Sequence, residues 1–126
     1  MKELFLAHDG LLFSCPEYNS SISGLWKNTI DWVSRPCAGE PPLGCFLYKV
    51  ATLMSASPGA LGGLRGLVTL RSILSNIKVL VMPDQVAVPK AHEAFTPDGT
   101  LKDPGQQAAI EKLGADLVGI LKKLVI

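Results

Sequence analysis

Apolar and polar residues alternate in blocks along the chain, and the spacing inside each block predicts its secondary structure. Residues 10–15 and 49–55 are short, almost continuous apolar runs, which are typical of strands buried on both faces of a sheet. Residues 78–82 predict a third strand, and Pro83 either ends this strand or marks it as an edge strand. A further short extended segment is expected at residues 85–89.

Helical periodicity is found between these runs. Residues 24–34 predict a helix that Ser21 or Ser23 caps, and residues 64–75 predict a second helix. Their inner faces should carry the apolar residues at helical spacing, which are Ile22, Leu25, Trp26, Ile30 and Val33 for the first helix and Leu64, Leu67, Val68 and Leu74 for the second. Residues 1–7 look like the end of another helix.

The last helix has the clearest sequence signals. Asp103 is its expected N-cap, Pro104 takes the first helical position, and Gln106 completes a capping-box pattern. Apolar residues then recur at helical spacing, namely Ile110, Leu113, Leu117, Leu121 and Leu124. The segment before this helix, residues 91–102, is expected to be a loop with a turn at residues 97–99.

The alternation of strands and helices predicts a single α/β domain over residues 1–126. Such an order forms a parallel sheet with helices on both faces. In these sheets ligands bind beyond the carboxyl ends of the strands. Two loops are expected at that edge, residues 16–23 and residues 56–63, and any binding site should be built from them.

Composition and charge exclude several classes of protein. Of the 126 residues, 48% are apolar and 18% are charged, so a disordered tail is excluded. The net charge of +1 argues against a nucleic-acid-binding protein, and no uncharged apolar run reaches the ~18 residues of a membrane span. The cysteines Cys15, Cys37 and Cys45 form no CxxC pair, which indicates a reducing compartment, the cytoplasm. Cys15 ends an apolar run and is expected to be buried.

The two loops carry the candidate chemistry. The second loop is rich in glycine, which lets backbone amides approach an anion or the polar edge of a ring, but a tight turn would need the same small residues. It is neither a nucleotide P-loop nor a G-x-G-x-x-G motif. In the first loop, Glu17, Tyr18 and Asn19 suit a planar heteroaromatic ligand. The spacing of these residues alone favours an ordinary loop that binds no ligand, in which Asn19 forms a local turn.

Hydrolytic and metal-dependent chemistry finds little support. His8 and His92 are far apart in the sequence and belong to no cluster with metal-ligand spacing. Ser57 lacks the G-x-S-x-G pattern of a nucleophile elbow. Trp26 and Trp32 lie six residues apart and are expected in the core or in a subunit contact. We therefore assign no side chain as a catalytic acid, base or metal ligand.

Three segments resemble the NADPH-dependent FMN reductase family. They are residues 16–36 (PEYNSSISGLWKNTIDWVSRP), 55–63 (SASPGALGG) and 86–95 (VAVPKAHEAF), the last followed by Asp98-Gly99. The resemblance covers nearly the whole chain and implies a flavodoxin-like fold with FMN as cofactor. It implies that one set of residues borders the isoalloxazine ring, Pro16, Glu17, Tyr18 and Asn19. A second set would lie near the ring or the neighbouring subunit, Ser57, Pro58 and Gly59.

The resemblance also implies a reaction and an assembly. The chain would be an NAD(P)H-dependent oxidoreductase, with NAD(P)H as co-substrate and bound FMN passing hydride to free flavin, a quinone or a similar small acceptor. The flavin performs this chemistry, so no side-chain acid or base is required. Homodimers or homotetramers are usual in the family, with flavin sites close to the subunit interface.

The chain departs from the family pattern at its start. The flavodoxin-like strand order is 2-1-3-4-5, and this sequence matches only strands 3, 4 and 5. We expect the first two strands and the phosphate-binding loop to be missing. The chain would then be a reductase whose remainder is encoded upstream, a short form that completes its sheet with another chain, or a non-catalytic interaction module that has lost flavin binding.

Overall fold

Three parallel strands lie at the centre of the computed structural model, which describes residues 1–124. The strands β1 (Gly10–Ser14), β4 (Val50–Ala56) and β5 (Leu80–Val88) lie in the order β1-β4-β5, with both neighbouring pairs parallel. The central strand β4 is almost entirely buried, as expected for a strand with helices on both of its faces. The predicted parallel sheet is confirmed.

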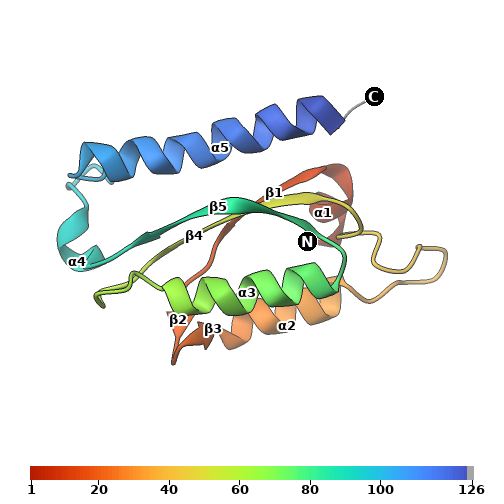
Figure 1. Cartoon of the computed structure of the whole chain (residues 1–126). Coiled ribbons are helices and arrows are strands. Elements are labelled where there is room, and N and C mark those ends of the chain that lie inside the picture. The colour runs from red at the N-terminus through yellow and green to blue at the C-terminus, as the bar shows by residue number, and fades with distance from the viewer. Residues whose placement is uncertain (125–126) are drawn as a thin grey trace.

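Helices cover both faces of this sheet (Figure 1). Two of them, α2 (Gly24–Val33) and α3 (Leu64–Asn76), lie side by side on one face, and α5 (Pro104–Leu124) crosses the other face. The larger hydrophobic core lies under α2 and α3, and a smaller cluster lies under α5. Two short helices, α1 (Lys2–Ala7) and α4 (Ala91–Ala94), complete the helical structure of the described residues.

Strand β5 differs from the prediction. We expected Pro83 either to end the strand at residues 78–82 or to mark an edge strand, and one strand runs from Leu80 to Val88. Its pairing with β4 shifts between Ala51, which faces Val81, and Leu53, which faces Gln85. The bulge accommodates the proline because β5 is an edge strand, where a missing N–H breaks no ladder. The expectation of an edge strand is confirmed, whereas the expectation of a strand end is wrong.

The inner faces of α2 and α3 are partly misassigned by the sequence pattern. Ile30 and Val33 of α2 are buried as predicted, but Leu25 is 77% exposed. In α3 the predicted inner residues Leu64 and Val68 are exposed. Leu67 and Leu74 are buried as predicted, and the helix also buries Gly66 and Leu70. The apolar residues surround much of each helix, so their spacing alone does not fix which stripe faces the sheet.

Caps at two helix starts agree with the prediction. The Ser23 hydroxyl accepts a hydrogen bond from the Trp26 backbone N–H at 3.2 Å and begins α2. Asp103 Oδ1 accepts hydrogen bonds from the backbone N–H groups of Gly105 at 2.8 Å and Gln106 at 3.2 Å, and begins α5.

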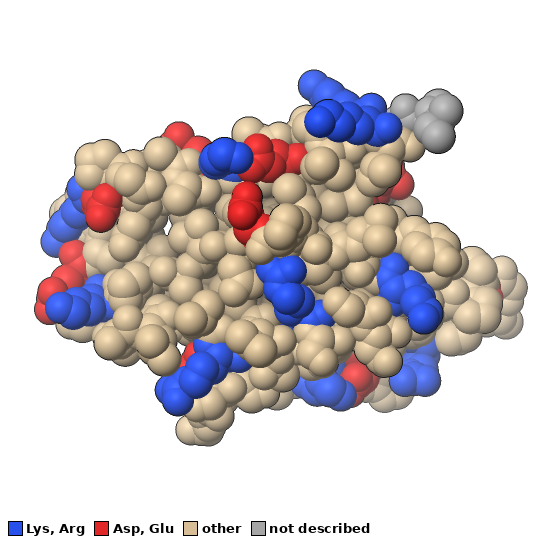
Figure 2. Space-filling model, in the orientation of Figure 1, with Lys and Arg blue, Asp and Glu red and all other residues tan. Residues whose placement is uncertain are grey.

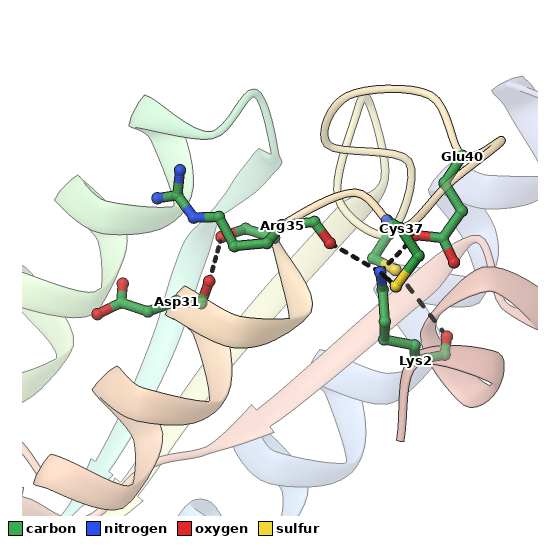
Figure 3. Close-up of polar contacts among 7 residues, drawn as sticks. Lys2, Asp31, Arg35, Cys37 and Glu40 are labelled. Atoms are coloured by element: carbon green, nitrogen blue, oxygen red, sulfur yellow. Dashed lines mark hydrogen bonds and ion pairs between the residues drawn. The ribbon is translucent and has the colours of Figure 1, made fainter.

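A polar cluster fastens α1 to the segment that follows α2 (Figure 3). The Lys2 ammonium donates to the Arg35 carbonyl at 2.7 Å, to Cys37 Sγ at 3.4 Å and to the Glu40 carboxylate. The Cys37 backbone N–H lowers the pKa of Glu40, helped by Lys2, and the Glu40 carboxylate raises the pKa of Lys2. The rings of Phe5 in α1 and Phe46 lie 5.2 Å apart.

The surface shows no concentration of one charge on the face seen in Figure 2, where basic and acidic side chains are interspersed. No helix in the described part of the chain is long and apolar enough to cross a membrane. Within residues 1–124, no group of three or more His, Cys, Asp or Glu side chains is placed to hold a metal ion.

Candidate functional site

The two predicted loops follow β1 and β4 at the carboxyl ends of these parallel strands. The Cys15 backbone N–H donates to the Met54 carbonyl at 2.9 Å and extends the β1–β4 pairing to the start of the first loop. The second loop begins after Ala56 and leads into α3. Because parallel strands end at the same edge of a sheet, this edge is where a ligand site is expected.

The first loop forms a small hairpin that the sequence pattern did not predict. Its strands, β2 (Glu17–Tyr18) and β3 (Ser21–Ile22), are antiparallel. The two residues between them, Asn19 and Ser20, have φ angles of 53° and 66°. Positive φ at both central positions is the conformation of a tight type I′ turn, which asparagine tolerates better than most residues. Asn19 therefore shapes the turn, as its local-turn interpretation expects.

The hairpin presents Tyr18 and Asn19 to solvent. Pro16 and Asn19 are exposed, and Tyr18 is 62% exposed. An aromatic ring that is left in water at the edge of the sheet offers a flat apolar surface to a planar ligand. Three of the four first-loop candidates are thus accessible to a ligand.

Glu17 points in another direction and is only 12% exposed at its side chain. Its Oε2 accepts a hydrogen bond from the Gly66 backbone N–H at 3.1 Å, in the first turn of α3. Its Oε1 lies 3.6 Å from Nη2 of Arg65. The carboxylate of the first loop therefore contacts the helix that begins at the end of the second loop.

The second loop is fixed to the end of β5. The Ser57 backbone N–H donates to the Val88 carbonyl at 3.1 Å, and the Ser57 carbonyl accepts from Ala91 at 3.0 Å. The Gly59 carbonyl accepts from Lys90 at 3.1 Å, and the Ser57 hydroxyl accepts from the Gly59 N–H at 3.3 Å. Ser57 is half-buried, whereas Pro58 and Gly59 are exposed.

The tip of the second loop contains two candidate donors that sequence reasoning missed. Within the described residues, the backbone N–H groups of Ala60 and Leu61 donate to no protein acceptor, and both residues are exposed. In the sequence, only the glycine content of the loop indicated accessible amides, and it did not identify which residues provide them. An exposed ring on one loop and two available amides on the other can bind the face and the polar edge of a heteroaromatic ligand.

The Cys15 thiol and the two histidines make local contacts. Burial raises the pKa of the Cys15 thiol to about 11, so this thiol is protonated at neutral pH and packs as a small apolar group, as predicted. His8 bonds the Leu4 carbonyl at 2.7 Å, and His92 pairs with Glu93 at 3.1 Å. All three cysteines are free thiols.

Comparison with known proteins gives consistent matches. The family model of NADPH-dependent FMN reductases matches residues 1–93. An NAD(P)H-dependent FMN reductase of Pseudomonas aeruginosa is 38% identical over 112 residues, which are 88% of this chain and 58% of that protein. A probable NADPH:quinone oxidoreductase of Oryza sativa is 38% identical over 78% of this chain and 46% of its own length.

A solved structure is similar as well. FerB, a flavoenzyme NAD(P)H:(acceptor) oxidoreductase from Paracoccus denitrificans, aligns with a TM-score of 0.76 and 27% identity. The alignment covers 94% of this chain and 65% of FerB, and it confirms the flavodoxin-like fold. The chain spans about half the length of the relatives that it matches. On these matches, the chain belongs to the NADPH-dependent FMN reductase family.

Proposed function

We propose that this chain forms part of an NAD(P)H-dependent flavin reductase. In this proposal, FMN lies against the two loops and passes hydride from NAD(P)H to free flavin, a quinone or a similar small acceptor. The observation that carries the proposal is that the family-like segments 16–36 and 55–63 lie at the carboxyl ends of adjacent parallel strands. The names of the relatives, FMN reductase and quinone oxidoreductase, support the same chemistry.

The described residues suit a flavin ring. The ring of Tyr18 would lie against the isoalloxazine system, and the N–H groups of Ala60 and Leu61 would donate to its carbonyl oxygens or ring nitrogens. Asn19 would hold Tyr18 in place through the tight turn. Pro16, Ser57, Pro58 and Gly59 would border the ring. Bound FMN supplies the hydride chemistry, and these residues orient the ring and exclude water from it.

A flavin titration tests this function. We expect the purified protein to be yellow, or to quench FMN fluorescence on titration, and NADPH to bleach the flavin absorbance. Tyr18→Ala should weaken FMN binding about twofold to tenfold, because an aromatic contact contributes roughly 0.5–1.5 kcal/mol beyond its buried area. Asn19→Gly keeps the positive φ that the turn needs and should change the affinity less.

The matched control for the titration is Tyr48→Ala, because Tyr48 is a similarly exposed tyrosine that precedes β4 at the opposite end of that strand. This variant should bind FMN as the wild type does. A folded, colourless protein that takes up no FMN would contradict the proposal and would favour the non-catalytic interaction module. Equal affinities of wild type and Tyr18→Ala would contradict the placement of the ring.

We also propose that the chain assembles as a homodimer or homotetramer through the outer surface of α2 and α3. Large apolar side chains are exposed there, and Trp32 is 72% exposed. Leu25, Leu64 and Val68 are also exposed on these two helices. Exposed apolar surface of this kind is typical of protein–protein contacts.

Light scattering tests the assembly. The wild type should have a mass of two or four times 13.4 kDa, and Trp32→Glu should shift it towards the monomer because a buried, unpaired charge disfavours association. The control is Val118→Glu, an equally drastic change at an exposed residue of α5 on the opposite face of the sheet. A monomeric wild type would refute this assembly.

The free cysteines support our further proposal that the protein works in the cytoplasm.

A further inference from the structure

We infer that Glu17 is a positioning residue that holds the two loops of the candidate site in one arrangement, with its carboxylate bound to α3 and not to a flavin. The inference deepens the proposed function, on which the naming of flavin as the ligand rests. The contact between the loops is a property of this chain and can be measured without any ligand.

Helix α3 depends on a capping group from outside its own segment. Its N-cap is Gly63, which has no side chain, and its first turn contains no acidic residue. A helix start leaves backbone N–H groups without partners and carries a partial positive charge, so a carboxylate stabilises it. Glu17, 49 residues earlier in the chain, supplies that carboxylate to the Gly66 N–H at 3.1 Å.

The hairpin is also packed closely against α3. A Cβ atom built on Gly66 would lie 3.1 Å from the Ser21 carbonyl oxygen and 3.3 Å from Glu17 Cβ. On Gly63 it would lie 3.6 Å from Glu17 Cβ. The absence of a side chain at Gly66 lets the hairpin backbone approach the helix start, whereas the distance at Gly63 is an ordinary contact. Close packing at Gly66 therefore supports the carboxylate contact.

This contact sets how the two candidate ligand surfaces lie relative to each other. Tyr18 follows Glu17 directly in β2, and the amides of Ala60 and Leu61 precede α3 by a few residues. Releasing Glu17 would let the hairpin and the second loop move independently. Both oxygens of Glu17 already face donors, the Gly66 N–H and the Arg65 guanidinium, so its carboxylate is not needed for ring recognition.

Two substitutions of Glu17 distinguish its hydrogen bond to the Gly66 N–H from its charge interaction with Arg65. Glu17→Ala removes both contacts, whereas Glu17→Gln keeps an oxygen acceptor for the Gly66 N–H and loses the attraction to Arg65. The matched control is Asp103→Ala, which removes the N-cap of α5 instead. Each variant would be compared with the wild type by residue-resolved amide hydrogen exchange without ligand and by FMN titration.

We expect Glu17→Ala to speed exchange in residues 18–21 and 57–66 together and to weaken FMN binding about tenfold, the effect of losing one charge-assisted hydrogen bond. Glu17→Gln should restore most of the protection. Asp103→Ala should leave both segments as protected as in the wild type, which a general loss of stability would not do. Where Glu17→Ala does not fold, Glu17→Met, which also removes both contacts but keeps the length of the side chain, supplies the exchange comparison.

Unchanged exchange in residues 57–66 of Glu17→Ala would overturn the inference, as would equal changes in Asp103→Ala. If Glu17→Ala exchanges faster in both loops but binds FMN with unaltered affinity, the inference that Glu17 positions the flavin site is wrong. A wild-type protein that binds no FMN would refute the proposed function, while the exchange data would still decide whether Glu17 couples the loops.

Discussion

Gly62→Ala should be among the most destabilising single-methyl changes in this chain. Gly62 has a φ of 62°, and a Cβ atom there would lie 2.5 Å from the Val88 carbonyl carbon and 2.6 Å from the Pro89 nitrogen. Both atoms belong to the backbone and cannot rotate away. The left-handed conformation costs roughly 1–2 kcal/mol and the forced shift of β5 roughly 1–3 kcal/mol, so we expect a loss of about 3 kcal/mol.

Urea or thermal unfolding would measure this loss, with Gly59→Ala as the control in the same loop. A Cβ atom on Gly59 would meet only the Ser57 hydroxyl at 3.7 Å, so its free energy of unfolding should change by about 0.5 kcal/mol or less. Equal unfolding midpoints for Gly62→Ala and the wild type would show that the second loop does not pack against Val88 as described. The pair thus tests the loop that carries Ser57, Pro58 and Gly59.

Phe46→Ala should lower the free energy of unfolding by about 3–5 kcal/mol, the usual cost of removing a buried aromatic side chain. Phe46 is 0% exposed and packs against Phe5, although it lies in an irregular segment between α2 and β4. It provides a hydrophobic anchor for α1, none of whose residues is buried. Equilibrium unfolding would measure the loss.

The neighbouring Leu47 supplies the control for Phe46, because it is 41% exposed and its replacement by alanine should cost far less. A loss of about 3–5 kcal/mol is a large part of the stability of an ordinary domain, so Phe46→Leu is the milder variant to use if Phe46→Ala does not fold. Similar losses in Phe46→Ala and Leu47→Ala would contradict the packing of this segment.

Much of the fold could be predicted because the strongest patterns come from complete burial. The run that forms β4 is almost continuously apolar because helices cover both faces of the strand. Pro83 misled the strand prediction, since only the pairing register shows the bulge that accommodates it. The prediction that Leu25 and Val68 are buried was wrong, because exposed apolar side chains on α2 and α3 have the same helical spacing as buried ones.

Less of the candidate site than of the fold could be predicted from the sequence. The family motif located both loops, and the structure places them at the expected edge of the sheet. The contact of Glu17 with α3 joins residues that are 49 positions apart, and no local pattern encodes such a pairing. A hint lay in the start of α3, where Gly63 and the lack of acidic residues leave the helix without a cap of its own.

The two outer strands of the sheet differ in how well they resist aggregation. On one side, β5 interrupts its edge with Pro83 and a bulge, and both features hinder pairing with a strand from another molecule. On the other side, β1 pairs only with β4 within residues 1–124, contains no proline, and exposes about half of Leu12. Where no further strand pairs with β1, self-association into extended β-structure should begin there, and a charged residue at position 12 would be the simplest protection against it.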